Sequence, residues 1–110
     1  MRILLDECVP RRFRSALRGH NCLTAPDAGF AGQKNGSLLQ LTENAGFEVF
    51  LTIDQGIAYQ QNLSGRRISV LIILARSNRL EDILPFAAEC QSTLERLRPG
   101  SVVRIGDRSA

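Results

Sequence analysis

Residues 1–10 read MRILLDECVP, an apolar segment that ends on two adjacent carboxylates. The run RILL at 2–5 is typical of a strand buried on both faces, which favours a parallel sheet. Pro10 suits the first turn of a helix, so a helix should follow the strand closely. Asp6 and Glu7 lie between the two elements, where their mutual repulsion at ~4 Å and an effective dielectric of ~20 is about 4 kcal/mol. The pair therefore calls for a positive partner.

The rest of the chain alternates apolar strand-like runs with helical patterns. Further strands are expected at 21–25, 48–53, 68–74 and 102–105, and helices at 37–45, 58–63 and from 80 to about 98. Pro85 should kink or restart the last helix, and Asn78 with Glu81 resembles a capping box at its start. This order predicts an α/β fold with an open, mainly parallel sheet, a strand order near 2-1-3-4 and the last strand at an edge.

The composition is that of one globular domain. The chain has 110 residues, of which 44% are hydrophobic and 23% charged, which suits a single core and excludes disorder. We expect the domain to cover residues 1–106, with a short tail at 107–110. No apolar run approaches the ~20 residues that span a bilayer.

Charge and cysteine usage indicate a compartment and a class of partner. The net charge is +3, and thirteen of the fourteen basic residues are arginine, whose planar fork suits phosphate. The cysteines Cys8, Cys22 and Cys90 are odd in number and have no paired spacing, and no signal peptide precedes the first strand. We therefore expect a reduced, cytoplasmic protein with no membrane contact and a mild preference for nucleic acid or an acidic partner.

Two of the expected strands end on acids. Ligands of open α/β sheets bind at the carboxyl ends of the strands, where the strand order reverses. If the strands at 2–5 and 48–53 are neighbours, Asp6, Glu7 and Asp54 meet at that edge. Oxygen ligands without His or Cys suit Mg²⁺ or Mn²⁺. The implied chemistry is phosphoryl transfer or hydrolysis at a phosphodiester, although Glu7 also fits a solvated residue beside a helix N-terminus.

Several arginines surround these acids. Arg11 and Arg14 lie at helical spacing after the first strand, and Arg76 follows the fourth strand. They are candidates for contacts to RNA phosphates, which would position an RNA without reading its bases. A merely solvated helix face is the competing interpretation of Arg11 and Arg14.

Three segments resemble the small bacterial PIN-like proteins, relatives of the VapC-type toxin ribonucleases. They are LLDECVPRR at 4–12, GFAGQKNGSLL at 29–39 and LTIDQGIAYQQNLSGRR at 51–67. The resemblance implies a Rossmann-like sheet and an acidic pocket that holds Mg²⁺ or Mn²⁺ and cuts RNA. It also implies a cognate antitoxin protein and a homodimer. The family's acids match Asp6 and, in the T-x-D motif, Asp54.

The chain departs from the family pattern at two positions. Asn35 stands where many relatives have an acid before the second helix, and Gly56 stands where they often have a second acid after the third strand. Asn35 still offers a carbonyl oxygen but no charge, so fewer anions would hold the ion. Either Glu7 compensates as a further metal ligand and catalytic carboxylate, or the protein binds without cutting.

Two other functions fit parts of the pattern. A non-catalytic PIN-like module would bind RNA or protein and would not need the metal. A receiver domain of a response regulator would also place Asp6 and Glu7 after the first strand and a phospho-accepting Asp54 after the third. Receivers need a lysine at the end of the fifth strand, however, and the only lysine here is Lys34.

Overall fold

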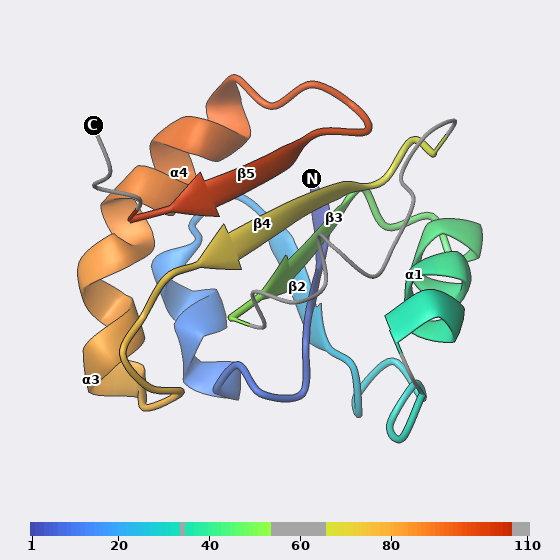
Figure 1. The fold of residues 1–110 in the computed structure, drawn as a ribbon, viewed down its shortest axis with the longest axis horizontal. Helices are drawn as coiled ribbons and strands as arrows, with labels where there is room; N and C mark the ends of the chain where they lie inside the picture. The colour runs from blue at the N-terminus through green and yellow to red at the C-terminus, as the bar shows by residue number, and fades with distance from the viewer. Residues whose placement is uncertain (34, 54–65, 107–110) are drawn as a thin grey trace.

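The computed structural model describes residues 1–33, 35–53 and 66–106, and the side chains of Asn35 and Gly36 lie outside that description. Five parallel strands form one open sheet in the order β2-β1-β3-β4-β5 (Figure 1). The strands are β1 (Arg2–Leu5), β2 (Asn21–Thr24), β3 (Val49–Thr52), β4 (Ser69–Ile73) and β5 (Val102–Ile105). The expected parallel sheet and the order 2-1-3-4 are confirmed, and β5 is an edge strand as expected.

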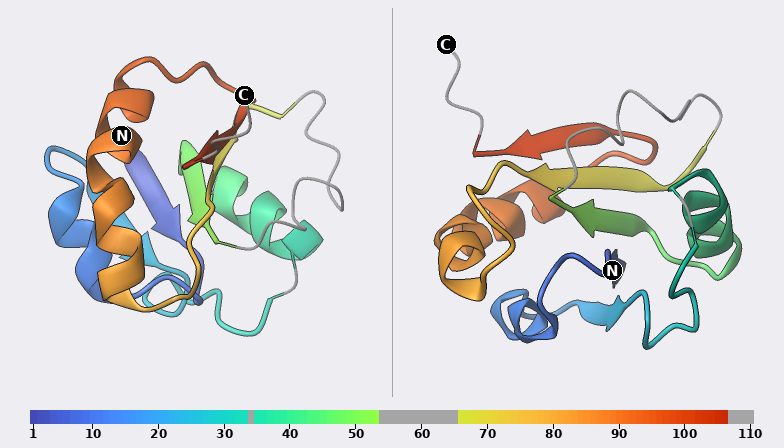
Figure 2. Two further views of the ribbon diagram at one scale, coloured as in Figure 1. Left: turned by 60° about the vertical axis from the view of Figure 1, so that its left-hand side comes forward. Right: turned by 60° about the horizontal axis from the view of Figure 1, so that its bottom comes forward.

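Helices cover both faces of the sheet, which explains why the central strands are apolar on both sides. Every residue of β3 and β4 is buried. Figure 2 shows the sheet between two helical layers. One face packs against η1 (Arg11–Ala16), α3 (Leu80–Ile83) and α4 (Ala87–Glu95), and the other against α1 (Asn35–Asn44). The architecture is therefore a three-layer α/β sandwich consistent with a Rossmann-like fold.

Alternating residues of each strand supply two separate cores. On the face of η1 and α4, side chains such as Leu5, Leu51 and Leu71 pack with Phe13 and Leu94. On the face of α1, the intervening strand residues pack with the helix; this core contains Leu4, Phe50, Val70, Ile72, Leu38 and Leu39. Each strand therefore has no freedom to slip by one residue, because a slip would exchange the two faces.

The helices differ from expectation in detail. The helix expected after β1 is present, but it is the 3-10 helix η1 at Arg11–Ala16 and not an α-helix. Pro85 does restart the last helix, because α3 passes into the 3-10 turn η2 (Leu84–Phe86) before α4 begins. The capping box is wrong: Arg79 is the N-cap of α3 and no side chain caps it. Instead, the Ser77 hydroxyl donates to Asp82 Oδ2 at 2.5 Å.

Two expectations lie outside the described residues, namely the helix at 58–63 and the tail at 107–110. In the part of the chain that the structure describes, no helix is long and apolar enough to cross a membrane.

Candidate active site at the carboxyl edge of the sheet

The strand order reverses between β1 and β3. The chain passes from β1 to its neighbour β2 on one side and later returns to β3 on the other side. Leu5 and Leu51 are register partners at the carboxyl end of this pair. The Asp6 N–H extends the ladder by donating to the Leu51 carbonyl at 2.9 Å. Asp6 therefore lies at the switch point where ligands of such sheets bind.

The Asp6 carboxylate is buried and is held by three donors. Only 8% of the residue remains exposed. The Glu7 backbone N–H donates to Oδ1 at 2.8 Å, and the Thr52 hydroxyl donates to Oδ2 at 2.7 Å. The Cys8 thiol is a weaker donor to Oδ2 at 3.5 Å. The carboxylate is therefore fixed in orientation by the last residue of β3 and by two residues of the loop that follows β1.

All three donors to Asp6 are neutral. Among the described residues, no arginine or histidine forms an ion pair with Asp6; the ion pairs that the structure has involve Asp27, Glu43 and Glu81. A carboxylate offers about four lone-pair positions, and the described residues fill three of them, which leaves one on Oδ1 without a described donor. A buried anion that no positive side chain compensates is chemically suited to an external cation.

The Cys8 thiol stays protonated in this setting. Burial raises the pKa of Cys8, and the charge of Asp6 adds to that rise. The thiol also lies 3.8 Å from the Thr52 hydroxyl. Cys8 therefore serves as a weak hydrogen-bond donor to the carboxylate and not as a thiolate ligand.

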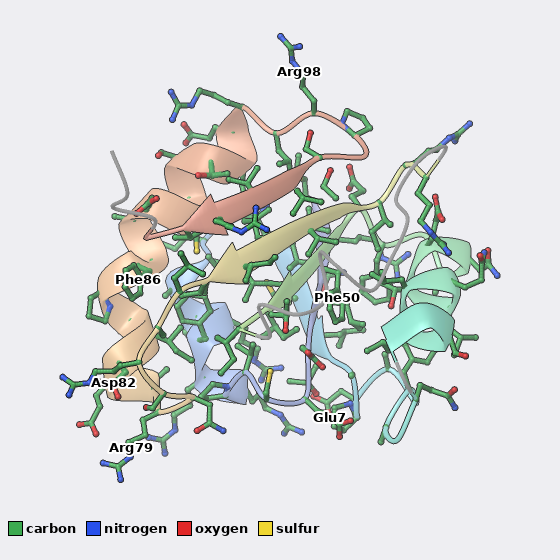
Figure 3. All side chains as sticks on the ribbon, in the orientation of Figure 1. Glu7, Phe50, Arg79, Asp82, Phe86 and Arg98 are labelled. Atoms are coloured by element: carbon green, nitrogen blue, oxygen red, sulfur yellow. The ribbon has the colours of Figure 1, made fainter. Side chains whose placement is uncertain are left out.

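Glu7 differs from Asp6 although it is the next residue. Its side chain is exposed and lies on the loop between β1 and η1, at the bottom of the view in Figure 3. Within the described ranges its carboxylate makes no hydrogen bond or ion pair. The two acids that the sequence shows as a pair thus have separate surroundings, and only Asp6 is built into the sheet.

The remaining predicted ligands lie outside the description. Asp54 falls in the undescribed range 54–65, and Asn35 is the first residue of α1 but its side chain is not described. No group of three or more His, Cys, Asp and Glu side chains able to hold a metal occurs within residues 1–33, 35–53 and 66–106. The metal site with Asp54 and Asn35 therefore stays a prediction.

Arg11 has a partner that the sequence analysis missed. Its guanidinium forms an ion pair with Asp27 at 2.6 Å, with 58% and 28% of the two side chains exposed. Asp27 is positioned by its own backbone N–H, which donates to Thr24 Oγ1 at 3.1 Å at the end of β2. Asp27 is thus a further acid at the carboxyl edge, and the Arg11 guanidinium already balances its charge.

Arg14 and Arg76 are exposed and make no side-chain hydrogen bond or ion pair with the described residues. Arg76 lies in the loop between β4 and α3, which is at the carboxyl edge, and Arg14 lies within η1. Thr52 was missed as the partner of Asp6. The available signal was a hydroxyl residue at the end of a buried strand, two positions before an acid.

A cavity of about 320 Å³ lies at the opposite, amino edge of the sheet, between Phe47, Val49, Arg67 and Pro99. Its polar walls are internally bonded. Ser69 Oγ donates to the Arg98 carbonyl and accepts from Ser101 N–H. This cavity lies at the other edge of the sheet from Asp6, and the acids in its lining, Glu43 and Glu48, accept from backbone N–H groups of Arg67 and Arg2.

No family model, no curated protein and no solved structure matches this chain. The resemblance to the PIN-like proteins therefore depends on the sequence motifs and on nothing else.

Proposed function

We propose that this protein is a metal-dependent ribonuclease of the PIN-like type, with Asp6 and Asp54 as ligands of Mg²⁺ or Mn²⁺. One observation carries the proposal: a buried carboxylate at the switch point is oriented by neutral donors and has no positive side chain beside it in the described structure. A divalent ion would supply the missing positive charge. No other described acid combines burial with this lack of a cation.

The bond between Thr52 and Asp6 supports Asp54 as the second ligand. Thr52 ends β3, and Asp54 follows it by two positions. Two residues span at most ~7 Å of chain. If the chain is anchored at Thr52, its reach to position 54 is short, and an ion bound to Asp6 would be open to Asp54 as a second ligand.

The donor set fits a hard ion. Two carboxylates, with a carbonyl oxygen from Asn35 and the exposed Glu7 as further contacts, suit Mg²⁺ or Mn²⁺, which keep several waters and bind substrate phosphate directly. When bound, the ion would polarise a phosphodiester and activate a water. Thr52 and the Glu7 backbone N–H would orient Asp6 toward the ion.

The three candidate arginines differ in whether their guanidinium groups are already paired with an acid. Arg14 and Arg76 are exposed and would contact RNA phosphates directly. Arg11 is engaged by Asp27, so a phosphate would have to compete with that carboxylate. We also propose that the protein is a toxin that acts in the cytoplasm, forms a homodimer and is neutralised by a cognate antitoxin.

The test is cleavage of a mixed RNA pool while Mg²⁺ or Mn²⁺ is titrated. Asp6→Asn and Asp54→Asn should each abolish cleavage, whereas Asp27→Asn should retain it. Asp6→Asn should fold, because its carbonyl can accept from Glu7 N–H while the Thr52 hydroxyl turns to accept from the amide. Circular dichroism checks the fold. Cleavage that survives both substitutions, or that ignores chelation, would overturn the proposal.

The strand order also fits a second candidate function, that of a receiver domain, although less well. The order 2-1-3-4-5 is that of the flavodoxin-like fold, which receiver domains share. A receiver would be phosphorylated on Asp54 by acetyl phosphate. The end of β5 reads Arg104-Ile105-Gly106, without the lysine that holds a phosphoryl group. RNA binding that survives chelation and Asp54→Asn would instead indicate a non-catalytic module.

A further inference from the structure

The shortest ion pair of the described residues lies at the carboxyl edge of the sheet. Arg11 Nη2 is 2.6 Å from Asp27 Oδ1, whereas the other two ion pairs are 3.3 and 3.6 Å long. Arg11 is the first residue of η1, and Asp27 belongs to the turn that follows β2. The pair therefore connects the segment after β1 to the segment after β2.

This ion pair lies beside the switch point. Leu5 and Thr24 are register partners at the carboxyl ends of β1 and β2. Asp6 follows Leu5 directly, and Asp27 follows Thr24 by three positions. The Ala25 N–H donates to the Leu5 carbonyl at 2.8 Å, which ties the start of the turn to the end of β1. Asp6 and Asp27 therefore belong to neighbouring segments of the same edge.

The two partners of the ion pair are held differently. The Asp27 N–H donates to the hydroxyl of the buried Thr24 at 3.1 Å, and the Ala28 N–H donates to the Thr24 carbonyl at 3.0 Å. Arg11 reaches the carboxylate from a side chain that is 58% exposed, against 28% for Asp27. Because exposed ion pairs are weak, Arg11 can exchange Asp27 for another anion while Asp27 stays in its turn.

The 3-10 geometry of η1 places a second arginine next to Arg11. Residues three positions apart in such a helix lie on the same side, ~6 Å along its axis. Arg11 and Arg14 have this spacing within η1, and Arg14 makes no side-chain hydrogen bond or ion pair with the described residues. An RNA strand held at Arg14 would bring a neighbouring phosphate to Arg11 at a high effective concentration.

We propose that Asp27 sets the RNA affinity of this protein by competing with RNA phosphates for Arg11. The inference rests on the proposed function, because it takes RNA as the ligand of the carboxyl edge. Asp27 is a positioning residue: it acts through Arg11 and makes no contact with RNA. Its carboxylate holds the guanidinium in the free protein and weakens RNA binding by the strength of that ion pair.

The exchange of partners has a consequence for salt dependence. A phosphate that takes Arg11 releases a counterion from the RNA, but it leaves the Asp27 carboxylate without its cation. Asp27 then takes up a cation from solution, so the exchange adds nothing net to the salt dependence. Without that carboxylate, the same contact releases a counterion with no uptake to offset it.

The probe is a short labelled oligouridylate, and its binding to the full chain is followed by fluorescence anisotropy in EDTA, where no metal-dependent cleavage occurs. Asp27→Asn should bind the probe about two- to fivefold more tightly than the wild type. The matched control is Glu43→Gln, which removes the same charge and frees Arg66 at the opposite edge. The control should bind like the wild type. Equal tightening in both variants would mean that only net charge matters, and would overturn the proposal.

Salt titration and a double variant test the role of Arg11. The slope of log affinity against log salt should steepen by about 0.7 in Asp27→Asn, the value for one more phosphate contact on a single strand. Arg11→Gln combined with Asp27→Asn should bind no more tightly than the wild type and should lose the added slope. Tightening by Asp27→Asn that is equally large with and without Arg11 would contradict the proposal.

Cleavage of the same RNA, measured after Mn²⁺ is restored, separates this inference from the nuclease. The predicted binding pattern without any cleavage would overturn the nuclease and support the role of Asp27. Cleavage with an unchanged affinity and salt slope in Asp27→Asn would overturn the role of Asp27 alone. A failure of the wild type and of every variant to bind RNA would overturn both.

Discussion

The amino and carboxyl edges of the sheet use their charged residues in opposite ways. At the amino edge, Glu43 accepts from Arg67 N–H at 2.7 Å and from the Arg66 guanidinium at 3.3 Å, so α1 is tied to the start of β4. The Arg2 guanidinium donates to the Ala45 carbonyl at 2.7 Å and lies 4.4 Å from the ring centre of Phe47. These charges connect elements of the fold.

At the carboxyl edge, the buried acid Asp6 forms no ion pair with any described residue. Asp6 is held by a backbone N–H, a hydroxyl and a thiol. Asp6 is thus the buried acid that only neutral groups bond, whereas the charges of the amino edge are bonded to arginines and backbone groups. The charges of the amino edge therefore connect elements of the fold, whereas Asp6 at the carboxyl edge forms no ion pair with the described residues.

The largest effect on stability should come from the amino edge. Gly100 has φ +75°, and a Cβ built there would lie 2.7 Å from the Arg66 carbonyl oxygen. Gly100→Ala should therefore lower the free energy of unfolding by more than about 2 kcal/mol. The control Gly19→Ala has a similar φ of +81° with nothing within 4 Å of its Cβ, so it should cost only about 1 kcal/mol. Urea denaturation measures both, and equal losses would mean that the contact with Arg66 is unimportant.

A smaller effect is expected where Thr52 meets Asp6. Thr52→Val keeps the shape but removes a donor from a buried carboxylate, and should cost about 1–2 kcal/mol. The control is Thr42→Val in α1, where the buried hydroxyl donates to the Leu38 carbonyl; that carbonyl keeps its helical partner, so the change should be nearly neutral. A loss at Thr42 as large as the loss at Thr52 would contradict the account of Asp6.

Glu43 should give a weak pH dependence. The Arg67 N–H, and then Arg66, hold the pKa of Glu43 below its usual value of 4.5. The stabilisation is therefore present above that value and is lost as the pH falls through the lower pKa of the folded state. Because the pair keeps contact with solvent, Glu43→Gln should cost less than about 1 kcal/mol at neutral pH. The difference from the wild type should vanish in acid, and a difference that grows in acid would refute the role of Glu43.

The smallest effect concerns alkylation of the thiols. Cys22 and Cys90 are buried, and burial raises the pKa of Cys90 to about 12. Cys8 is partly exposed at the carboxyl edge. Iodoacetamide should therefore modify Cys8 first in the folded protein, slowly because the pKa of its thiol is also raised by burial, as mass spectrometry of digests would show. Modification of Cys90 before Cys8 would mean that the core around α4 opens more readily than the edge.

Much of the fold was predictable because the spacing of apolar residues along the sequence indicates which faces of a strand are buried. The run 2–5 and the fourth strand at 68–74 are apolar on both faces, which is possible only in a covered parallel sheet. The details that failed are local. Residues 11–16 adopt a 3-10 helix although their pattern fits an α-helix equally well. The N-cap of α3 is Arg79, whose side chain makes no capping bond, and Ser77 bonds to the side chain of Asp82 instead.

The candidate site was predictable only in part. The position of Asp6 could be predicted from the end of an apolar run. That Asp6 is buried while Glu7 is exposed could not be predicted, because the sequence of a loop has no periodic pattern that assigns one of two adjacent residues to the core. Thr52 and Asp27 were missed for a similar reason. Their roles depend on contacts with Asp6 and Arg11, which lie 46 and 16 positions away in the sequence.

The central claim is that the Asp6 carboxylate binds a divalent ion, and titration of Mn²⁺ in a calorimeter tests it most directly. The wild type should bind Mn²⁺, Asp6→Asn should lose that binding while staying folded, and Glu43→Gln at the opposite edge should bind like the wild type. Mn²⁺ binding that is unchanged in Asp6→Asn, or that is lost in Glu43→Gln alone, would contradict the account.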